Sequence, residues 1–138
     1  MTLSYRKLAR QRALQALYEY FISLNPVNEI AARYLLDVEK RPFDVDYFHL
    51  LLNGVVKHQE EIDSLITACL NRKLSEVTPI ELCLLRLATF ELLKVSETPF
   101  QVVINEAVEL NKKFGTQEGF KFVNGVLDCI SKKLRANT

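Results

Sequence analysis

Two segments of the chain, Thr78–Glu81 and Thr98–Gln101, carry the same helix-start pattern 20 residues apart. Each places Thr at the N-cap and Pro at the first helical position, with Glu or Gln three residues after the Thr, where it can reach back to the cap amide. The Pro costs no hydrogen bond, because first-turn amides have no acceptor within the helix. The pattern predicts two successive helices. The first is apolar nearly all round, which is typical of a buried helix, and the second keeps one polar face.

Apolar residues recur at helical spacing through the rest of the chain. This periodicity predicts a first helix over about residues 4–24, a short helix near 28–38 and a long helix over about 44–70, which Asp44 caps. No break is expected in the long helix, with a kink near Gly54 as the alternative. A last helix begins at Thr116 or Gln117, and its predicted buried stripe consists of Phe120, Val123, Leu127, Ile130 and Leu134.

No β-branched and polar residues alternate at length, so the pattern favours an all-α fold. We expect a compact bundle of about six helices in two small three-helix subdomains, forming one domain over residues 1–138, since a chain of this length fits one domain. Gly54 and Gly125 both fall inside predicted helices. Gly costs about 1 kcal/mol there relative to Ala, so both positions suggest close helix crossings.

The three cysteines, Cys69, Cys83 and Cys129, lie within apolar helical stretches. Their odd number and their placement favour buried free thiols in a reducing cytosol. No apolar run approaches the ~20 residues that a membrane span needs. Arg10 and Arg12 interrupt the N-terminus before any signal peptide could form. A soluble, cytoplasmic protein is therefore expected.

A formal net charge of +1 conceals a strong asymmetry along the chain. Residues 1–18 carry four basic residues and no acidic one, residues 112–138 carry six basic against two acidic, and residues 19–111 are acidic overall. If the two basic ends meet in the fold, they form one positive surface, as in nucleic-acid-binding proteins.

Two groups of residues could bind an anion. Arg6, Lys7 and Arg10 occupy the first two turns of the first helix, where cations oppose the helix dipole, so a bound anion would relieve them. The alternative is a solvated helix end. The second group is a helix junction in which phenylalanines alternate with lysines, a pattern that suits unpaired bases because rings stack and cations take phosphates. Here Phe122 is expected to be exposed, whereas Phe114 and Phe120 have a core alternative.

Other chemistry finds little support in the sequence. His49 and His58 are nine residues apart and point to different helix faces, and no two cysteines lie within four residues, so no metal site is expected. Neither a nucleophile elbow nor a glycine-rich phosphate loop occurs. We therefore expect neither an enzyme nor a cofactor.

Arg86 is a cation inside an otherwise apolar helix. A buried charge needs a partner, because removing that partner costs about 3–5 kcal/mol. Its candidate partners are Glu91, Glu106, Glu109 and helix C-terminal carbonyls. A contact of Arg86 with a protein partner or with RNA is the alternative.

Four blocks of sequence together resemble the NusB family of bacterial transcription antitermination factors: Arg10–Tyr18, Ile80–Leu92, Val103–Leu110 and Lys121–Asp128. The likeness runs from about Arg6 to Asp128. The resemblance implies two small helical subdomains without catalysis. It also implies a heterodimer with NusE, a small-subunit ribosomal protein. That heterodimer would bind the single-stranded boxA element in the leader of nascent ribosomal RNA, and would nucleate a complex with RNA polymerase, NusA and NusG.

The resemblance also implies roles for individual residues. The RNA side would comprise Arg6, Lys7, Arg10, Phe114, Glu118, Lys121 and Phe122, and the NusE side would include Tyr18 and Glu81. The N-terminal run of basic residues is less dense here than in many family members, which suggests that RNA binding depends on NusE. The alternatives are a helical protein-interaction module, a homodimer that hides its basic face, or the RNA-docking domain of an RNA-modifying enzyme.

Overall fold

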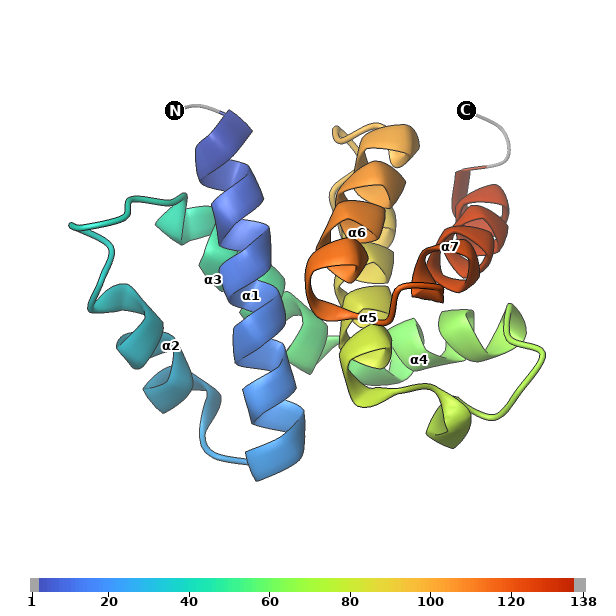
Figure 1. The fold of residues 1–138 in the computed structure, drawn as a ribbon, viewed down its shortest axis with the longest axis horizontal. Helices are drawn as coiled ribbons and strands as arrows, with labels where there is room; N and C mark the ends of the chain where they lie inside the picture. Colours follow the sequence, from blue (N-terminus) through green and yellow to red (C-terminus); the bar gives the residue numbers. More distant parts are fainter. Residues whose placement is uncertain (1–2, 136–138) are drawn as a thin grey trace. The chain divides into compact units, whose positions relative to one another are not determined.

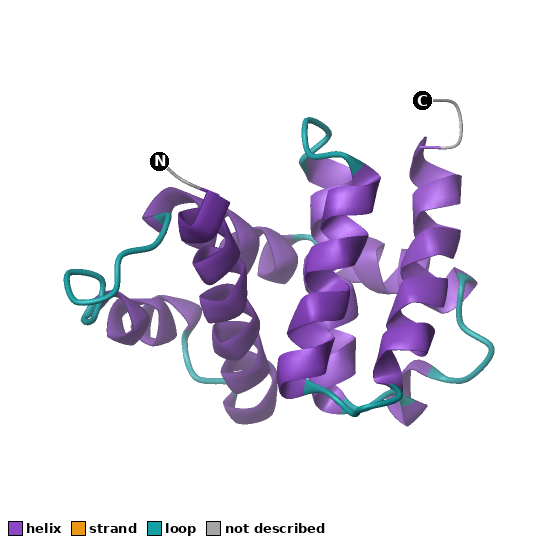
Figure 2. Ribbon diagram, turned by 45° about the horizontal axis from the view of Figure 1, so that its top comes forward, coloured by secondary structure: helices purple, strands orange, loops and turns teal. Residues whose placement is uncertain are grey.

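The computed structural model describes residues 3–135, so both ends of the predicted 1–138 domain lie outside it. This part of the chain is helical and contains no strand, which confirms the all-α prediction (Figure 1, Figure 2). It divides into two compact units, one ending at Lys57 and the other beginning at His58. The first unit contains α1 (Leu3–Ser23), α2 (Val27–Leu35) and α3 (Val45–Lys57); the second contains α4 (Gln59–Ala68), a 3₁₀ turn (Leu74–Glu76), α5 (Pro79–Lys94), α6 (Phe100–Phe114) and α7 (Gly119–Arg135).

In the first unit α1 packs against both α2 and α3. The core of this unit includes Leu14, Leu17 and Phe48, all fully buried. Asp44 caps α3 as the sequence predicts: its carboxylate accepts a hydrogen bond from the Tyr47 amide at 3.0 Å. The Asp44 amide in turn donates to the carbonyl of Tyr5 at 3.1 Å, which ties the start of α3 to α1.

The predicted helix over residues 44–70 is wrong in one respect, because the chain leaves helical geometry at His58. His58 has φ −106° and ψ 22°, and the helix on either side resumes within one residue. Such a short interruption leaves the apolar periodicity nearly in phase, so the pattern does not reveal it. The His58 ring stacks on Phe90 with a centroid distance of 6.2 Å. This contact between residues far apart in sequence has no local signal.

Within the second unit α5 is the central helix, because it contacts α4, α6 and α7. Its residues from Cys83 to Leu92 are all buried, which confirms the prediction of a buried helix. The first start signal is also confirmed. Pro79 is the first helical residue, and the Thr78 hydroxyl accepts from the Glu81 amide at 3.4 Å. The Glu81 side chain reaches the Thr78 hydroxyl, at 2.8 Å, rather than the cap amide.

The second start signal is wrong in detail. Helix α6 begins at Phe100, its N-cap is Pro99, and no side chain caps it. Thr98 is buried, and its carbonyl accepts a hydrogen bond from Nη1 of Arg135 at 2.6 Å. Arg135 also donates to carbonyls at the C-terminal end of α5, including those of Leu92 and Val95. The Arg135 side chain at the end of α7 therefore fixes the turn between α5 and α6. The sequence pattern predicts instead that a local cap at Thr98 starts α6.

Arg86 is 7% exposed and forms a two-pronged ion pair with Asp63 of α4. Its Nε donates to Asp63 Oδ1 at 2.8 Å, and its Nη2 donates to Oδ2 at 3.0 Å. Asp63 was not among the candidate partners from the sequence. Because both prongs are satisfied within the unit, Arg86 is a structural residue that joins α4 to α5.

The expectation of three free thiols is wrong for two of them. Cys69 and Cys129 form a disulfide with a Cα–Cα distance of 5.9 Å, and Cys83 is the free cysteine of the described chain. The two bonded residues are 60 positions apart, so their pairing depends on the packing of the end of α4 beside α7. No helix between residues 3 and 135 is long and apolar enough to cross a membrane.

Candidate nucleic-acid interface

The junction of α6 and α7 carries the predicted alternation of cations and rings. Lys112 and Lys113 lie exposed in the last turn of α6, where a positive charge is favourable to the helix dipole. Phe114 ends the helix half-buried. The chain then turns through residues 115–118, with Glu118 exposed, and α7 begins at Gly119 rather than at Thr116 or Gln117. Lys121 follows on α7 and is exposed.

Thr116 anchors this loop to the start of α5. Its hydroxyl donates to Oε2 of Glu81 at 3.2 Å, and its carbonyl accepts from Nδ2 of Asn111 at 3.3 Å. Its carbonyl also accepts from the Gly119 amide at 3.1 Å. Glu81 is only 7% exposed, and its burial is compensated because one carboxylate oxygen accepts from Thr78 and the other from Thr116. The residue predicted to face NusE thus holds the α6–α7 loop in place.

The rings of this junction differ from expectation in their exposure. Phe120, assigned to the buried stripe of α7, is 37% exposed. Val123, Leu127 and Ile130 are buried as predicted. Phe122, expected to be exposed, is half-buried. The ring that is open to solvent is therefore Phe120, and the Lys121 ammonium lies 6.0 Å from its centroid.

A cation that the sequence reasoning missed covers Phe122. The guanidinium of Arg72, from the loop between α4 and α5, lies 4.4 Å from the Phe122 ring centroid. Arg72 is exposed. Arg72 lies 50 residues before Phe122, so no local sequence pattern links the two residues. The polar run Asn71–Lys73 indicates only that Arg72 lies in a loop.

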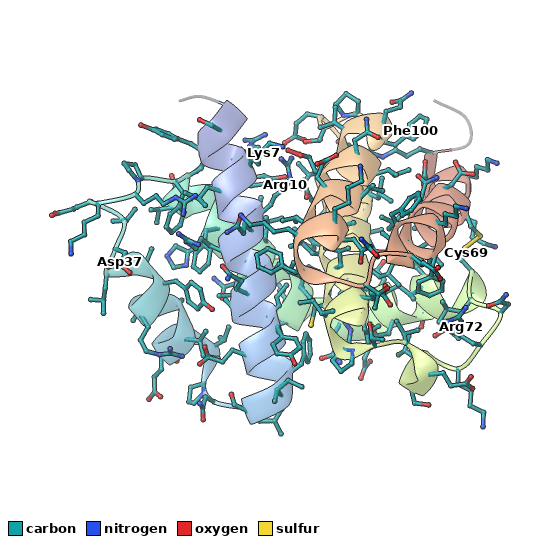
Figure 3. The ribbon with its side chains drawn as sticks, viewed as in Figure 1. Lys7, Arg10, Asp37, Cys69, Arg72 and Phe100 are labelled. Carbon is teal, nitrogen blue, oxygen red and sulfur yellow. A yellow bond between two sulfur atoms is a disulfide. The ribbon has the colours of Figure 1, made fainter. Side chains whose placement is uncertain are left out.

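In the first unit, two of the three predicted cations share one aromatic ring. The guanidinium carbons of Arg6 and Arg10 lie 4.1 Å and 5.5 Å from the centroid of Tyr47. Arg10 is only 5% exposed, whereas Lys7 is exposed; Figure 3 labels both on α1. Tyr18, the predicted partner residue on α1, is 40% exposed. That the two basic segments of the chain form one surface stays a prediction.

The described residues contain no group of three His, Cys, Asp or Glu side chains that could hold a metal ion. At the α6–α7 junction exposed cations and rings flank a hydrogen-bonded loop. Fold and surface together define the class: an all-α protein with a cationic, aromatic-bearing helix junction, the usual composition of a surface that contacts single-stranded nucleic acid.

The sequence comparisons give the family. The NusB family model matches residues 7–132, and the chain belongs to the NusB family. A transcription antitermination protein NusB from Pseudomonas syringae pv. tomato is 48% identical over 130 residues, which cover 94% of this chain and 79% of that protein. The NusB of Colwellia psychrerythraea is 45% identical, with 94% of each chain covered.

Solved structures agree with this assignment. NusB of T. maritima superposes with a TM-score of 0.84 and 31% identity, covering 93% of this chain and 91% of that one. A NusB chain in a crystal structure of antitermination factors NusB and NusE in complex with dsRNA gives a TM-score of 0.82 and 31% identity, with coverage of 96% and 99%. The predicted resemblance and the all-α fold are therefore confirmed.

Proposed function

We propose that this transcription antitermination factor acts by binding RNA together with NusE. The RNA target is the single-stranded boxA element in the leader of nascent ribosomal RNA, and the complex then assembles on RNA polymerase with NusA and NusG. Support comes from its family and from a similar NusB chain that was solved with NusE and dsRNA. In this proposal the two units function together as the single domain predicted over residues 1–138, and the protein has no catalytic role.

The observation that carries the proposal is the α6–α7 junction. Exposed Lys112 and Lys113 precede, and Lys121 follows, a loop that Glu81 holds through the side chain of Thr116. An ordered loop binds an extended strand at a lower entropic cost than a mobile one, because fewer side chains and dihedrals must be fixed on binding. Cations at this loop take phosphates, and an exposed ring offers a stacking face worth about 1–3 kcal/mol per base.

The other proposed contact residues differ in their position and in how accessible they are to RNA. Phe114, Glu118 and Phe122 lie at or beside the α6–α7 loop. Arg6 and Lys7 are the more accessible cations of α1, and Arg10, being buried, contributes mainly by ordering Tyr47 beside them. About four to six phosphate contacts to a single strand give a log–log salt slope near −3 to −4.

A protein partner surface is supported by α1. Tyr18 and Ile22 lie one helical turn apart, and both are exposed, at 40% and 59%. Large apolar side chains clustered on a surface mark interaction sites. We assign this face to NusE, with Glu81 acting on the partner side through the loop that it holds. A homodimer on the same face is the alternative, which light scattering of the protein with and without NusE separates.

The test is a titration of a boxA-like RNA and a scrambled RNA, each with and without NusE, followed by fluorescence anisotropy. Lys121→Gln is compared with Lys133→Gln, an exposed lysine further along the same helix. We expect Lys121→Gln to weaken boxA binding several-fold and to lower the salt slope by about 0.7, the contribution of one phosphate contact. Lys133→Gln should bind like the unmodified protein. Equal binding of the two RNAs with NusE present would overturn the proposal.

A further inference from the structure

Arg72 differs from the other arginines of the second unit in what surrounds it. Arg86 is buried and paired with Asp63, and Arg135 is bound to backbone carbonyls. Arg72 is exposed and forms no ion pair with any residue between positions 3 and 135, and its one hydrogen bond is a long contact of 3.5 Å to Asn71. Its guanidinium is held at a defined place nonetheless, by the Phe122 ring at 4.4 Å.

A guanidinium in this setting has the chemistry to bind a nucleotide. It is planar, so one face can lie on a phenylalanine while the opposite face accepts a stacked base. Its edge N–H groups donate to a phosphate in pairs. Phe122 follows Lys121 directly on α7, so the Arg72 side chain brings a cation from a distant part of the chain to the residue next to that lysine.

The Cys69–Cys129 disulfide limits where Arg72 can go. Cys129 lies seven residues after Phe122 on α7, which places the two side chains on the same helix face, about 10.5 Å apart along the axis. Cys69 precedes Arg72 by three residues, a segment that spans at most about 10–11 Å when extended. The loop is thus attached to one face of α7 at two points, covalently at Cys129 and through the guanidinium at Phe122 (Figure 3 labels Cys69 and Arg72).

We propose that Arg72 is a further RNA-contacting residue of the α6–α7 surface, and that the Cys69–Cys129 disulfide positions it there. This inference rests on the proposed RNA-binding function. Reduction by a dithiol such as dithiothreitol transfers two electrons and two protons to the disulfide, giving two cysteine thiols and the cyclic disulfide of the reagent. The loop then loses its covalent attachment, and RNA binding must pay the entropy of ordering Arg72.

The experiment measures boxA-like RNA binding in the presence of NusE by fluorescence anisotropy at several salt concentrations. Arg72→Gln should weaken binding about 5- to 10-fold, as expected for one lost stacking and phosphate contact. Arg72→Lys should keep the salt slope but bind more weakly than the unmodified protein, because an ammonium cannot stack as a guanidinium does. The matched control is Arg41→Gln, an exposed loop arginine of the first unit, which should bind unchanged.

The positioning role of the disulfide is tested by combining its reduction with the substitution of Arg72. Oxidised and reduced samples of the unmodified protein should differ about 2- to 5-fold in RNA affinity, because a loosened loop loses part of the roughly 5- to 10-fold that Arg72 contributes. In the Arg72→Gln background reduction should have no further effect. Peptide mass spectrometry without reductant should show Cys69 joined to Cys129. An equal effect of reduction in both backgrounds, or absence of the joined peptide, would overturn the positioning role.

Failure of this inference is distinguishable from failure of the proposed function. If Lys121→Gln weakens boxA binding while Arg72→Gln binds like the unmodified protein, Arg72 is not an RNA contact but the RNA-binding function stands. If the unmodified protein with NusE does not distinguish boxA-like from scrambled RNA, the proposed function itself fails, and the role of Arg72 fails with it.

Discussion

Gly119 is the position at which one added methyl group tests the architecture of the α6–α7 loop. It is buried at the start of α7. A Cβ at this position would overlap Oε2 of Glu81 and would lie 2.8 Å from Oγ1 of Thr116 and 2.9 Å from Nδ2 of Asn111. These are the atoms through which the loop is bound to α5 and α6, so the methyl group can be accommodated only if those hydrogen bonds move.

The expected cost of Gly119→Ala follows from these contacts. Overpacking a well-packed site costs about 1–3 kcal/mol, and a hydrogen bond to a carboxylate contributes about 1.5–3 kcal/mol. These effects share the same atoms and are not additive. The gain in helix propensity, at most about 1 kcal/mol, offsets part of the cost. We expect the free energy of unfolding to fall by about 2–3 kcal/mol, which lowers Tm by roughly 5–10 °C for a domain of this size.

Gly125→Ala is the matched control on the same helix. A Cβ at Gly125 meets nothing within 4 Å, and the residue is exposed. Alanine should therefore raise the free energy of unfolding by up to about 1 kcal/mol through helix propensity alone. Urea denaturation followed by far-UV circular dichroism measures both variants. The reasoning is refuted if Gly119→Ala lies within about 0.5 kcal/mol of the unmodified protein, the usual effect of an ordinary surface change.

Three further predictions concern the second unit. Asp63→Ala should lower the free energy of unfolding by about 3–5 kcal/mol in urea denaturation, because it leaves Arg86 buried without its carboxylate; a loss below 1 kcal/mol would contradict a structural ion pair. Reducing the Cys69–Cys129 bridge, with a sequence separation of 60, should cost about 4 kcal/mol by loop entropy, and a melting curve unaffected by dithiothreitol would count against it. Burial raises the pKa of the Cys83 thiol from 9.0 to about 12, so its contribution to stability is complete below pH 9 and is lost between pH 9 and 12; iodoacetamide at pH 8 should label Cys83 only after unfolding.

Features decided within a few residues of the chain could be predicted from the sequence. The Thr78 cap and the Asp44 cap each depend on an amide three residues away. The buried character of α5 follows from its composition. The helices themselves follow from apolar residues that recur at helical spacing. These predictions hold because the interaction and the signal occupy the same stretch of sequence.

Features that depend on distant partners could not be predicted in the same way. Asp63 precedes Arg86 by 23 residues, and Cys69 precedes Cys129 by 60. The candidate partners of Arg86 were helix C-terminal carbonyls, Glu91 on the same helix, and Glu106 and Glu109 on the next one. Its actual partner is an aspartate on the helix before it. The Gly125 expectation failed for a related reason: a mid-helix glycine indicates a close crossing only if a neighbour approaches it, and here none does.

The sequence also could not show which charges of the candidate site are available to RNA. Counting charges treats each arginine as available to RNA, yet Arg6 and Arg10 both lie over Tyr47 and Arg72 lies over Phe122. A ring face that holds a guanidinium cannot stack on a base until that cation leaves, so these rings act first by ordering cations. A base at such a place stacks on the guanidinium itself or displaces it. Alternation of rings and cations in a sequence therefore favours a nucleic-acid surface without saying which ring is open to a base; in the structure Phe120 is exposed and Phe122 is half-buried.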